Sequence, residues 1–317
     1  MEKRGIGEFL NSAFEGMSDE KILANQGFLR GKVRDIQDLG TRLLISTSDR
    51  ISAFDVVLTT IPCKGEVLNG LANYWFDQTR DIIPNHIEKT VSARTVLVKK
   101  CDVLPVEVVV RGYLTGSAWR DYDEGKTVSG IPLPEGMKFN QRFEKPLLTP
   151  STKAERGDHD EPISSAAIVE RGLVEEELWR KVELTAHALF QRGSSMLTER
   201  GLILVDTKYE FGLLDGELIL IDEVHTPDSS RFWFQDTYQE LFDAGEKQRK
   251  IDKEYLRQWL MEKGYMGNGT PPAIPDEVKI EVAWRYVQAY QLITGTDFVP
   301  SGNSPEAEME LIRSYLS

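Results

Sequence analysis

The sequence predicts an α+β protein of two lobes, with a helical C-terminal extension. Short runs of β-branched and other apolar residues dominate the first half of the chain. A Gly/Pro-rich stretch follows at 125–150, and helical spacing prevails after Phe234. We therefore expect a β-rich lobe over 1–118 and a mixed lobe over 119–317, whose helical tail begins near 235. A cleft between two such lobes is the usual position for a ligand.

The predicted elements follow one another along the chain. A small antiparallel sheet is expected over 27–60, and an amphipathic helix within 65–83 is expected to pack on it. The Gly/Pro-rich stretch is a candidate lobe junction or lid. Within the first sheet, strands are expected over 28–38, 42–47 and 54–59, with a turn at Leu39 and Gly40. Later in the chain we expect strands over 94–99 and 106–113 and a long amphipathic helix over about 174–192.

The most informative segment is the hairpin 203–231, in which two apolar strands each end in charged residues. Asp206, Lys208 and Glu210 occupy alternate positions of an extended chain, which puts them on one face. An Asp-Gly turn reverses the chain into a strand that ends at Asp222. Because Mg²⁺ accepts one or two carboxylates together with substrate phosphates, Glu210 and Asp222 are the predicted metal ligands. A solvated sheet edge is the competing interpretation.

Two arginines, each accompanied by serine, could hold one phosphate. A buried strand runs into Arg111 and then into a glycine turn, where Ser117 is the expected N-cap of a short helix. The segment after the hairpin supplies one acid, two hydroxyl groups and a guanidinium, among them Asp228, Ser230 and Arg231. The competing interpretation is that Ser117 only caps the helix and Arg111 only pairs with an acid.

Two further polar segments are weaker candidates. Gly31 would let a phosphate approach the backbone, and Lys32 and Arg34, on one face of the expected strand, could neutralise it. Lys153 is a candidate for reaching a nucleotide phosphate, and Asp160 would lie near the metal. Solvated strand and loop residues are the alternative for both segments. The sequence contains neither a GxxxxGK[ST] P-loop nor a Rossmann glycine fingerprint.

Composition excludes several classes of protein. The chain has 317 residues and a net charge of −13, which disfavours nonspecific binding to nucleic acid or to an anionic membrane. No apolar run approaches the roughly 20 residues of a membrane span, and the start of the chain lacks the apolar core of a secretory signal. We therefore expect a cytoplasmic protein without membrane or nucleic-acid partners.

Taken together, seven short motifs resemble those of the phosphoribosylaminoimidazole-succinocarboxamide synthase (SAICAR synthetase) family. Each motif is weak alone, but their joint occurrence in this order is specific. They are GKVRD, SDRISAFD, PCKGEVLN, VVVRGYLTGS, KAERGDHDEPIS, LILVDTKYEFG and DEVHTPDSSRFW.

The resemblance implies a two-lobe fold related to ATP-grasp and kinase-like nucleotide folds. It also implies an ATP-dependent ligase of purine biosynthesis that joins 5-amino-1-(5-phosphoribosyl)imidazole-4-carboxylate (CAIR) to L-aspartate, giving SAICAR, ADP and phosphate. Phosphorylation of the CAIR carboxylate would make this poor electrophile reactive, and such a transfer needs positioning and charge neutralisation above all. ATP, Mg²⁺, CAIR and L-aspartate are the implied ligands, and the chain would be a monomer or a small homo-oligomer.

The resemblance also implies roles for individual residues. The first lobe would bind the nucleotide, and the second lobe would bind the substrate and the metal. The ATP phosphates would be covered by Gly31, Lys32, Val33 and Arg34 and contacted by Lys153, the adenine pocket would be lined by Lys99 to Glu107, and Mg²⁺ would be held by Glu210 and Asp222. In the CAIR site, the catalytic residues Asp206 and Lys208 would face the imidazole and the carboxylate, Asp228 would contact the ribose or base, and the phosphate would be bound by Arg111, Ser117, Ser230 and Arg231. The candidates for the L-aspartate pocket are Asp49, Arg50, Ser52 and Lys64, with Asp160 close to the metal.

Two alternatives remain at this point. A small-molecule kinase would share the β-rich lobe, the phosphate-binding lysine and the paired acids, but it would transfer phosphate to a hydroxyl group. A nucleotide-binding module without activity would bind ATP and would tolerate Asp222→Asn.

Overall fold

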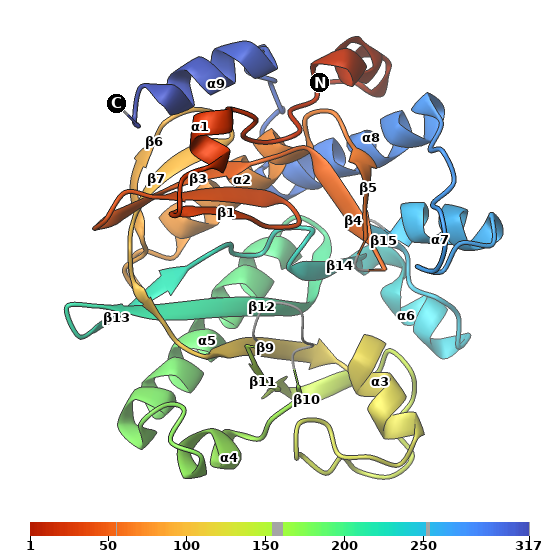
Figure 1. Cartoon of the computed structure of the whole chain (residues 1–317). Coiled ribbons are helices and arrows are strands. Elements are labelled where there is room, and N and C mark those ends of the chain that lie inside the picture. Colours follow the sequence, from red (N-terminus) through yellow and green to blue (C-terminus); the bar gives the residue numbers. More distant parts are fainter. Residues whose placement is uncertain (55, 154–160, 252–253, 317) are drawn as a thin grey trace. The chain divides into compact units, whose positions relative to one another are not determined.

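The computed structural model describes residues 1–54, 56–153, 161–251 and 254–316, and these form an α+β fold, as predicted. The chain divides into two compact units (Figure 1). The first unit contains residues 1–74, 86–100 and 251–317, and the second contains 75–85 and 101–250. This division differs from the expected boundary near 118, because strand 106–113 belongs to the second unit and the tail from 251 onward belongs to the first.

The first unit is built on a five-stranded antiparallel sheet with the order β1-β2-β3-β7-β6. The expected single strand over 28–38 is wrong. It is two antiparallel strands, in which Arg30 pairs with Asp35, and the turn between them contains Lys32. Lys32 and Arg34 therefore do not share the face of one strand. The strands are β1 (Phe28–Arg30), β2 (Arg34–Asp38), β3 (Arg42–Thr47), β6 (Ile87–Thr90) and β7 (Thr95–Lys99), with a separate pair β4 (Arg50–Ala53) and β5 (Val56–Thr60).

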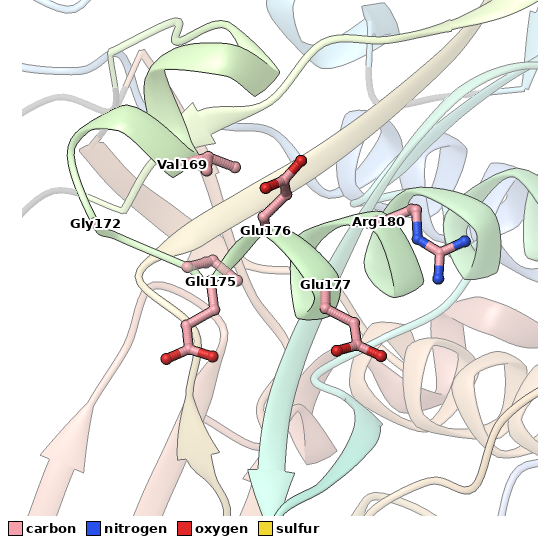
Figure 2. A pocket seen from close by; sticks show the side chains of 7 residues that line it. Val169, Gly172, Glu175, Glu176, Glu177 and Arg180 are labelled. Carbon is pink, nitrogen blue, oxygen red and sulfur yellow. The ribbon is translucent and has the colours of Figure 1, made fainter.

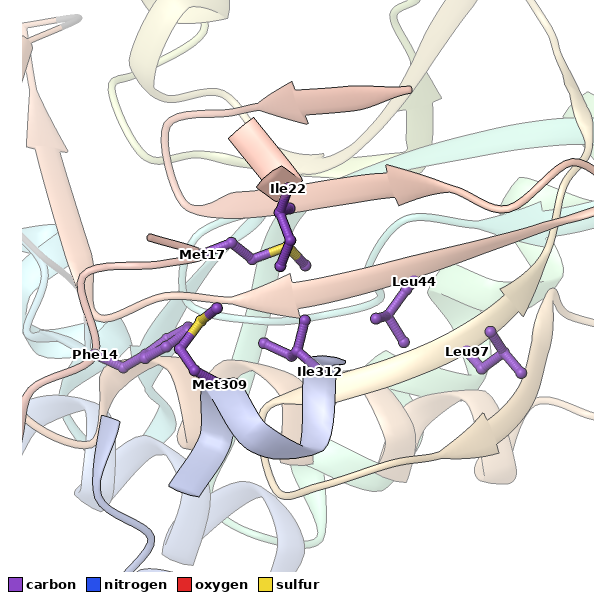
Figure 3. Packing of buried hydrophobic residues seen from close by; sticks show 7 residues of the cluster. All are labelled: Phe14, Met17, Ile22, Leu44, Leu97, Met309 and Ile312. Atoms are coloured by element: carbon purple, nitrogen blue, oxygen red, sulfur yellow. The ribbon is translucent and has the colours of Figure 1, made fainter. Parts of the chain in front are cut away.

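The C-terminal tail completes the core of the first unit (Figure 3). Met309 and Ile312 of helix α9 (Pro305–Arg313) pack against Leu44 of β3 and Leu97 of β7. Burial of these apolar side chains is the main stabilising term for such a helix. The other helices of this unit are η1 (Lys3–Ser12), α1 (Glu20–Leu23), most of α2 (Lys64–Gln78), α7 (Glu254–Glu262) and α8 (Asp276–Thr294).

The second unit contains a sheet whose strands run in the order β10-β9-β12-β14. The long strand β12 is central: it pairs with β9, β13, β14 and β8. The predicted turn of the 203–231 hairpin is confirmed, since Asp215 and Gly216 both have positive φ, at 52° and 82°. The strands are β8 (Asp102–Val103), β9 (Val106–Tyr113), β10 (Arg142–Leu148), β11 (Ser151–Thr152), β12 (Leu202–Leu214), β13 (Glu217–Ile221) and β14 (Ser230–Phe234); β15 (Lys250–Ile251) lies where the chain passes to the first unit.

Helix α5 (Glu176–Thr198) packs along β12 and β9 and corresponds to the predicted helix over 174–192 (Figure 1). Gly193 lets helix α5 approach the side chain of His225 closely, because a Cβ at this position would lie 2.4 Å from the His225 ring. The remaining helices are α3 (Gly116–Asp123), α4 (Ser165–Glu170) and α6 (Gln235–Asp243). None of the described helices is long and apolar enough to cross a membrane.

Candidate functional site

Charged side chains gather on one face of the sheet in the second unit. In the antiparallel β9–β12 pairing Arg111 lies opposite Asp206, and Lys208 lies opposite Val109. Side chains at directly opposed and at alternate positions share a face. The predicted common face of Asp206, Lys208 and Glu210 therefore also includes Arg111 and, two positions before Val109, Glu107.

Lys208 is the centre of a lysine–carboxylate cluster. Its Nζ donates to Oε1 of Glu107 at 2.7 Å and to Oε1 of Glu210 at 2.8 Å. The Nζ of Lys153 donates to the other carboxylate oxygen of Glu210. The predicted residues Lys153, Lys208, Glu107 and Glu210 are thus brought together, from β9, β12 and the segment after β11.

The cluster holds its groups in their charged forms. Burial alone would lower the pKa of Lys208, but Glu210, Asp222 and Glu107 outweigh it and raise this pKa above its ordinary value. Burial alone would raise the pKa of Glu210, but Lys208 and Lys153 outweigh it and lower this pKa. Lys208 is therefore a permanent cation at neutral pH and is suited to neutralising negative charge rather than to accepting a proton.

Arg111 and Arg231 form a second cluster around Asp206. Arg231 donates to both carboxylate oxygens of Asp206, with Nε at 2.8 Å from Oδ1, and Arg111 Nη1 lies 3.4 Å from Oδ2. Arg111 is further held by Thr149, at 2.8 Å from Nε, and by Ser117, at 3.1 Å from Nη2. Burial, with Arg231 adding to it, lowers the pKa of Arg111 despite Asp206. Two guanidinium groups beside one carboxylate leave an excess positive charge that an anion could neutralise.

The N-terminus of helix α3 adjoins this cluster. Thr115, not Ser117 as predicted, is the N-cap residue, and its side chain makes no capping hydrogen bond. Gly116 has a φ of +62°, and a Cβ there would lie 2.1 Å from Nη1 of Arg231. Ser117 lies inside the helix, where its hydroxyl is free to contact Arg111 instead. Helix N-termini favour anions, which adds to the attraction of the two arginines.

Asp222, the second predicted metal ligand, directly follows the β13 residue that pairs with Glu210. It has a φ of +65° and contributes to the raised pKa of Lys208. Within the described ranges, no group of three or more His, Cys, Asp or Glu residues could hold a metal ion. The ionised carboxylate of Glu210 nevertheless fits Mg²⁺, which needs only one or two protein carboxylates when phosphates supply further oxygens.

Two further predicted residues of the second unit, Ser230 and Asp228, form hydrogen bonds with threonine residues. Ser230 is 5% exposed, and its hydroxyl donates to the hydroxyl of Thr207 at 2.8 Å. Because adjacent strand residues point to opposite faces, Ser230 does not lie on the charged face that contains Arg231. Asp228 is half-buried in the turn before β14, where its N–H donates to Thr226 Oγ1 at 3.3 Å. Asp160 falls outside the described residues.

Four of the residues expected to bind the nucleotide, Gly31 to Arg34, lie at the turn between β1 and β2. Lys32 is exposed, and Val33 and Arg34 are half-buried. A Cβ at Gly31 would lie 2.8 Å from the carbonyl oxygen of Arg34, so this position requires glycine. Lys99 is exposed at the end of β7.

Two residues expected in the L-aspartate pocket are internal. Asp49 is fully buried and accepts hydrogen bonds from the N–H groups of Phe14 and Gly65, both at 2.7 Å, and it pairs with Arg94 at 3.1 Å. Lys64 is also fully buried, with Nζ 5.3 Å from the ring centroid of Tyr286. Their carboxylate and ammonium groups are enclosed by the protein, so a substrate could not reach them as they stand. Ser52 is half-buried on β4.

The structure adds two residues that sequence reasoning missed, Thr149 and Gly116. Thr149 orients Arg111 from the end of β10, and only the strand pairing reveals this. Gly116 had a sequence signal, because it lies in the glycine turn before a helix.

A surface pocket of about 620 Å³ lies where α4 leads into α5, and it contains none of the predicted residues (Figure 2). It is lined by Val169, Gly172, Val174, Glu175, Glu176, Glu177 and Arg180. Three carboxylates on its wall disfavour binding of phosphates.

Comparison with known proteins decides the family. The family model described as SAICAR synthetase matches residues 27–272. The chain belongs to the SAICAR synthetase family. It is 48% identical over 280 residues to the phosphoribosylaminoimidazole-succinocarboxamide synthase of Azobacteroides pseudotrichonymphae, covering 86% of each chain. It is 46% identical over 296 residues to that of Bacteroides thetaiotaomicron, covering 92% of this chain and 94% of the relative.

The fold agrees with this assignment. The structure of the SAICAR synthase from Saccharomyces cerevisiae complexed with SAICAR superposes with a TM-score of 0.79 at 36% identity, covering 90% of this chain and 100% of that chain. The predicted family, fold class and activity are confirmed: the chain is an ATP-dependent ligase of purine biosynthesis that joins CAIR and L-aspartate. The alternative of a small-molecule kinase is disfavoured.

Proposed function

We propose that the charged face of the second unit binds CAIR, with the phosphate at Arg111 and Arg231 and the carboxylate at Lys208. The supporting observation is the presence of two separate clusters on one strand. Successive same-face residues of a strand are about 7 Å apart, so Asp206 and Lys208 offer two sites for the two anionic ends of one substrate. Ser117 and the N-terminus of α3 would complete the phosphate site, and Asp228 would contact the ribose or base.

The reaction would then proceed by phosphoryl transfer. A carboxylate oxygen of CAIR attacks the γ-phosphorus of ATP, the bond to the ADP oxygen breaks, and an acyl phosphate forms. The amine of L-aspartate attacks the acyl carbon, loses a proton, and expels phosphate. Lys208 and Lys153 would neutralise the negative charge on the carboxylate and the transferred group.

For the nucleotide, Gly31, Lys32, Val33 and Arg34 would cover the phosphates, and adenine contacts are proposed for Lys99 and Glu107. Lys153 would reach the phosphates after leaving Glu210. Its side chain is 38% exposed, which is compatible with such movement.

Glu210 and Asp222 would hold Mg²⁺ together with ATP oxygens. The ion supplies neutralisation of phosphate charge when it is bound. We expect Asp222→Asn to lower turnover at least about tenfold at saturating substrates and to raise the Mg²⁺ concentration required. Wild-type turnover and wild-type Mg²⁺ dependence in the variant would contradict this assignment.

For L-aspartate, Ser52 remains the best of the initial candidates, because Asp49 and Lys64 are enclosed. The expectations of a monomer or small homo-oligomer, of cytoplasmic location and of no nucleic-acid partner stay predictions.

Isotope transfer tests the proposed route. CAIR labelled with ¹⁸O in its carboxylate should pass one labelled oxygen to inorganic phosphate during turnover with ATP and L-aspartate. ADP release should be measured with CAIR alone and again after L-aspartate is added. Phosphate without label, despite SAICAR formation, would exclude the acyl phosphate.

A further inference from the structure

The turn that joins β1 to β2 in the first unit is held from one side by two residues of a later segment. Nη2 of Arg50 donates to the carbonyl oxygen of Gly31 at 3.0 Å, and its Nε donates to that of Lys32 at 3.4 Å. Both the N–H and the hydroxyl of Ser48 donate to the carbonyl oxygen of Val33, at 2.9 and 2.5 Å. Three consecutive carbonyl groups are thus bound by Ser48 and Arg50.

Arg50 is itself held rigidly. Its side chain is 10% exposed, and its Nη2 lies 2.6 Å from Oδ1 of Asp35, a carboxylate with no exposed surface. Its Nη1 also donates to the carbonyl oxygen of Glu15. A Cβ at Gly16, whose φ is +117°, would lie 2.2 Å from the same Nη1, so glycine makes room for the guanidinium. Such a fully bonded guanidinium is unsuited to binding a free substrate carboxylate, which was the sequence-based expectation for Arg50.

The bound carbonyls determine where the neighbouring N–H groups point. In a planar trans peptide the N–H of one residue points opposite to the C=O of the residue before it. Because Arg50 binds the carbonyl groups of Gly31 and Lys32, the N–H groups of Lys32 and Val33 point away from Arg50. Successive N–H groups that point to one side form an anion-binding concavity.

We propose that Arg50, assisted by Ser48, is a positioning residue for the nucleotide: it holds this turn so that the N–H groups of Lys32 and Val33 face the ATP phosphates. The inference rests on the proposed nucleotide role of the turn. Arg50 touches no reacting atom, and its effect should appear in nucleotide affinity rather than in L-aspartate affinity.

Arg50→Lys is the informative variant, because lysine keeps a positive charge beside Asp35 but lacks the planar fork needed for two carbonyl groups. The dissociation constant of a non-hydrolysable ATP analogue, measured by calorimetry, should rise about tenfold or more, whereas the KM for L-aspartate should stay within about twofold. Ser48→Ala removes one of two bonds to Val33 and should weaken nucleotide binding by a smaller factor, about threefold. Should the lysine variant not fold, Ser48→Ala decides the question.

Arg30→Lys is the matched control, since Arg30 also pairs with Asp35, at 3.3 Å, and donates to Met17 rather than to the turn. It should leave nucleotide affinity unchanged.

Lys32→Ala distinguishes the nucleotide role of the turn from the positioning role of Arg50. If it leaves ATP affinity unchanged, the turn is not the nucleotide site and the proposed function of the turn fails. If it weakens ATP binding while folded Arg50→Lys and Ser48→Ala do not, only the positioning role is overturned. A raised L-aspartate KM with unchanged ATP affinity in Arg50→Lys would return Arg50 to the L-aspartate pocket.

Discussion

Lys208 donates a hydrogen bond across the β9–β12 pairing to Glu107, a residue 101 positions earlier in the chain. The same ammonium group also contacts Glu210 on its own strand, so two carboxylates hold one cation on the charged face of the sheet. This arrangement keeps Lys208 charged and in place before any substrate arrives. Such preorganisation is what electrostatic stabilisation of phosphoryl transfer requires.

Lys208→Ala should therefore lower turnover at least about tenfold, about 1.4 kcal/mol or more of transition-state stabilisation, at saturating substrates. The fold should persist, because Lys153 still neutralises Glu210. Steady-state kinetics and far-UV circular dichroism check both points. Lys126→Ala, which removes a lysine from an exposed pair with Glu124, is the control and should keep wild-type kinetics. Equal rates in the two variants would exclude Lys208 from catalysis.

Arg231→Ala should mainly raise the KM for CAIR, because it removes one of two guanidinium groups from the proposed phosphate site. Gly116→Ala should have the same effect without removing any charge, since the new Cβ would displace the guanidinium. The positive φ of Gly116 adds a strain of about 1 kcal/mol. Direct CAIR binding measurements test both variants. Unchanged CAIR affinity in Arg231→Ala would remove it from the phosphate site.

His225 should make the protein less stable in acid. Burial lowers its pKa from 6.5 to about 3, and its Nε2 lies 2.6 Å from the hydroxyl of Tyr209. Between pH 6.5 and 3 the unfolded state binds a proton that the folded state excludes, so stability falls as pH decreases, by up to about 1.4 kcal/mol per pH unit. Urea unfolding at pH 7 and pH 5 should show a smaller loss in His225→Gln than in the wild type. An equal loss would mean that His225 is not kept neutral in the folded protein.

The tail should be required for the stability of the first unit. Ile312 has no exposed surface and packs in the cluster that contains Leu44 and Leu97. Ile312→Ala should lower the free energy of unfolding by about 2–5 kcal/mol, as deletion of buried methyl groups does. Leu311→Ala, at 37% exposed on the same helix, is the control and should cost much less. Similar unfolding midpoints for the two variants would contradict a structural role for the tail.

The sequence predicted the alternation of Asp206, Lys208 and Glu210, because side-chain direction in a strand depends only on position along the chain. It did not predict the break in the 28–38 strand. That turn is stabilised by hydrogen bonds from Ser48 and Arg50, which lie on a later segment. Likewise Asp49 and Lys64 resemble exposed binding residues in the sequence, and only the packing of distant segments encloses them.

By itself, then, the sequence determined the α+β class, the family, the charged face of β12 and the hairpin turn, since these depend on local spacing and on short motifs. The tertiary structure decided which charged groups meet: Lys208 with Glu107, Arg111 with Arg231 around Asp206, and Arg50 with the turn at Lys32. It also decided that the tail completes the first unit. The physical reason is that burial and ion pairing depend on segments brought together from far along the chain, and local propensity contains no information on those contacts.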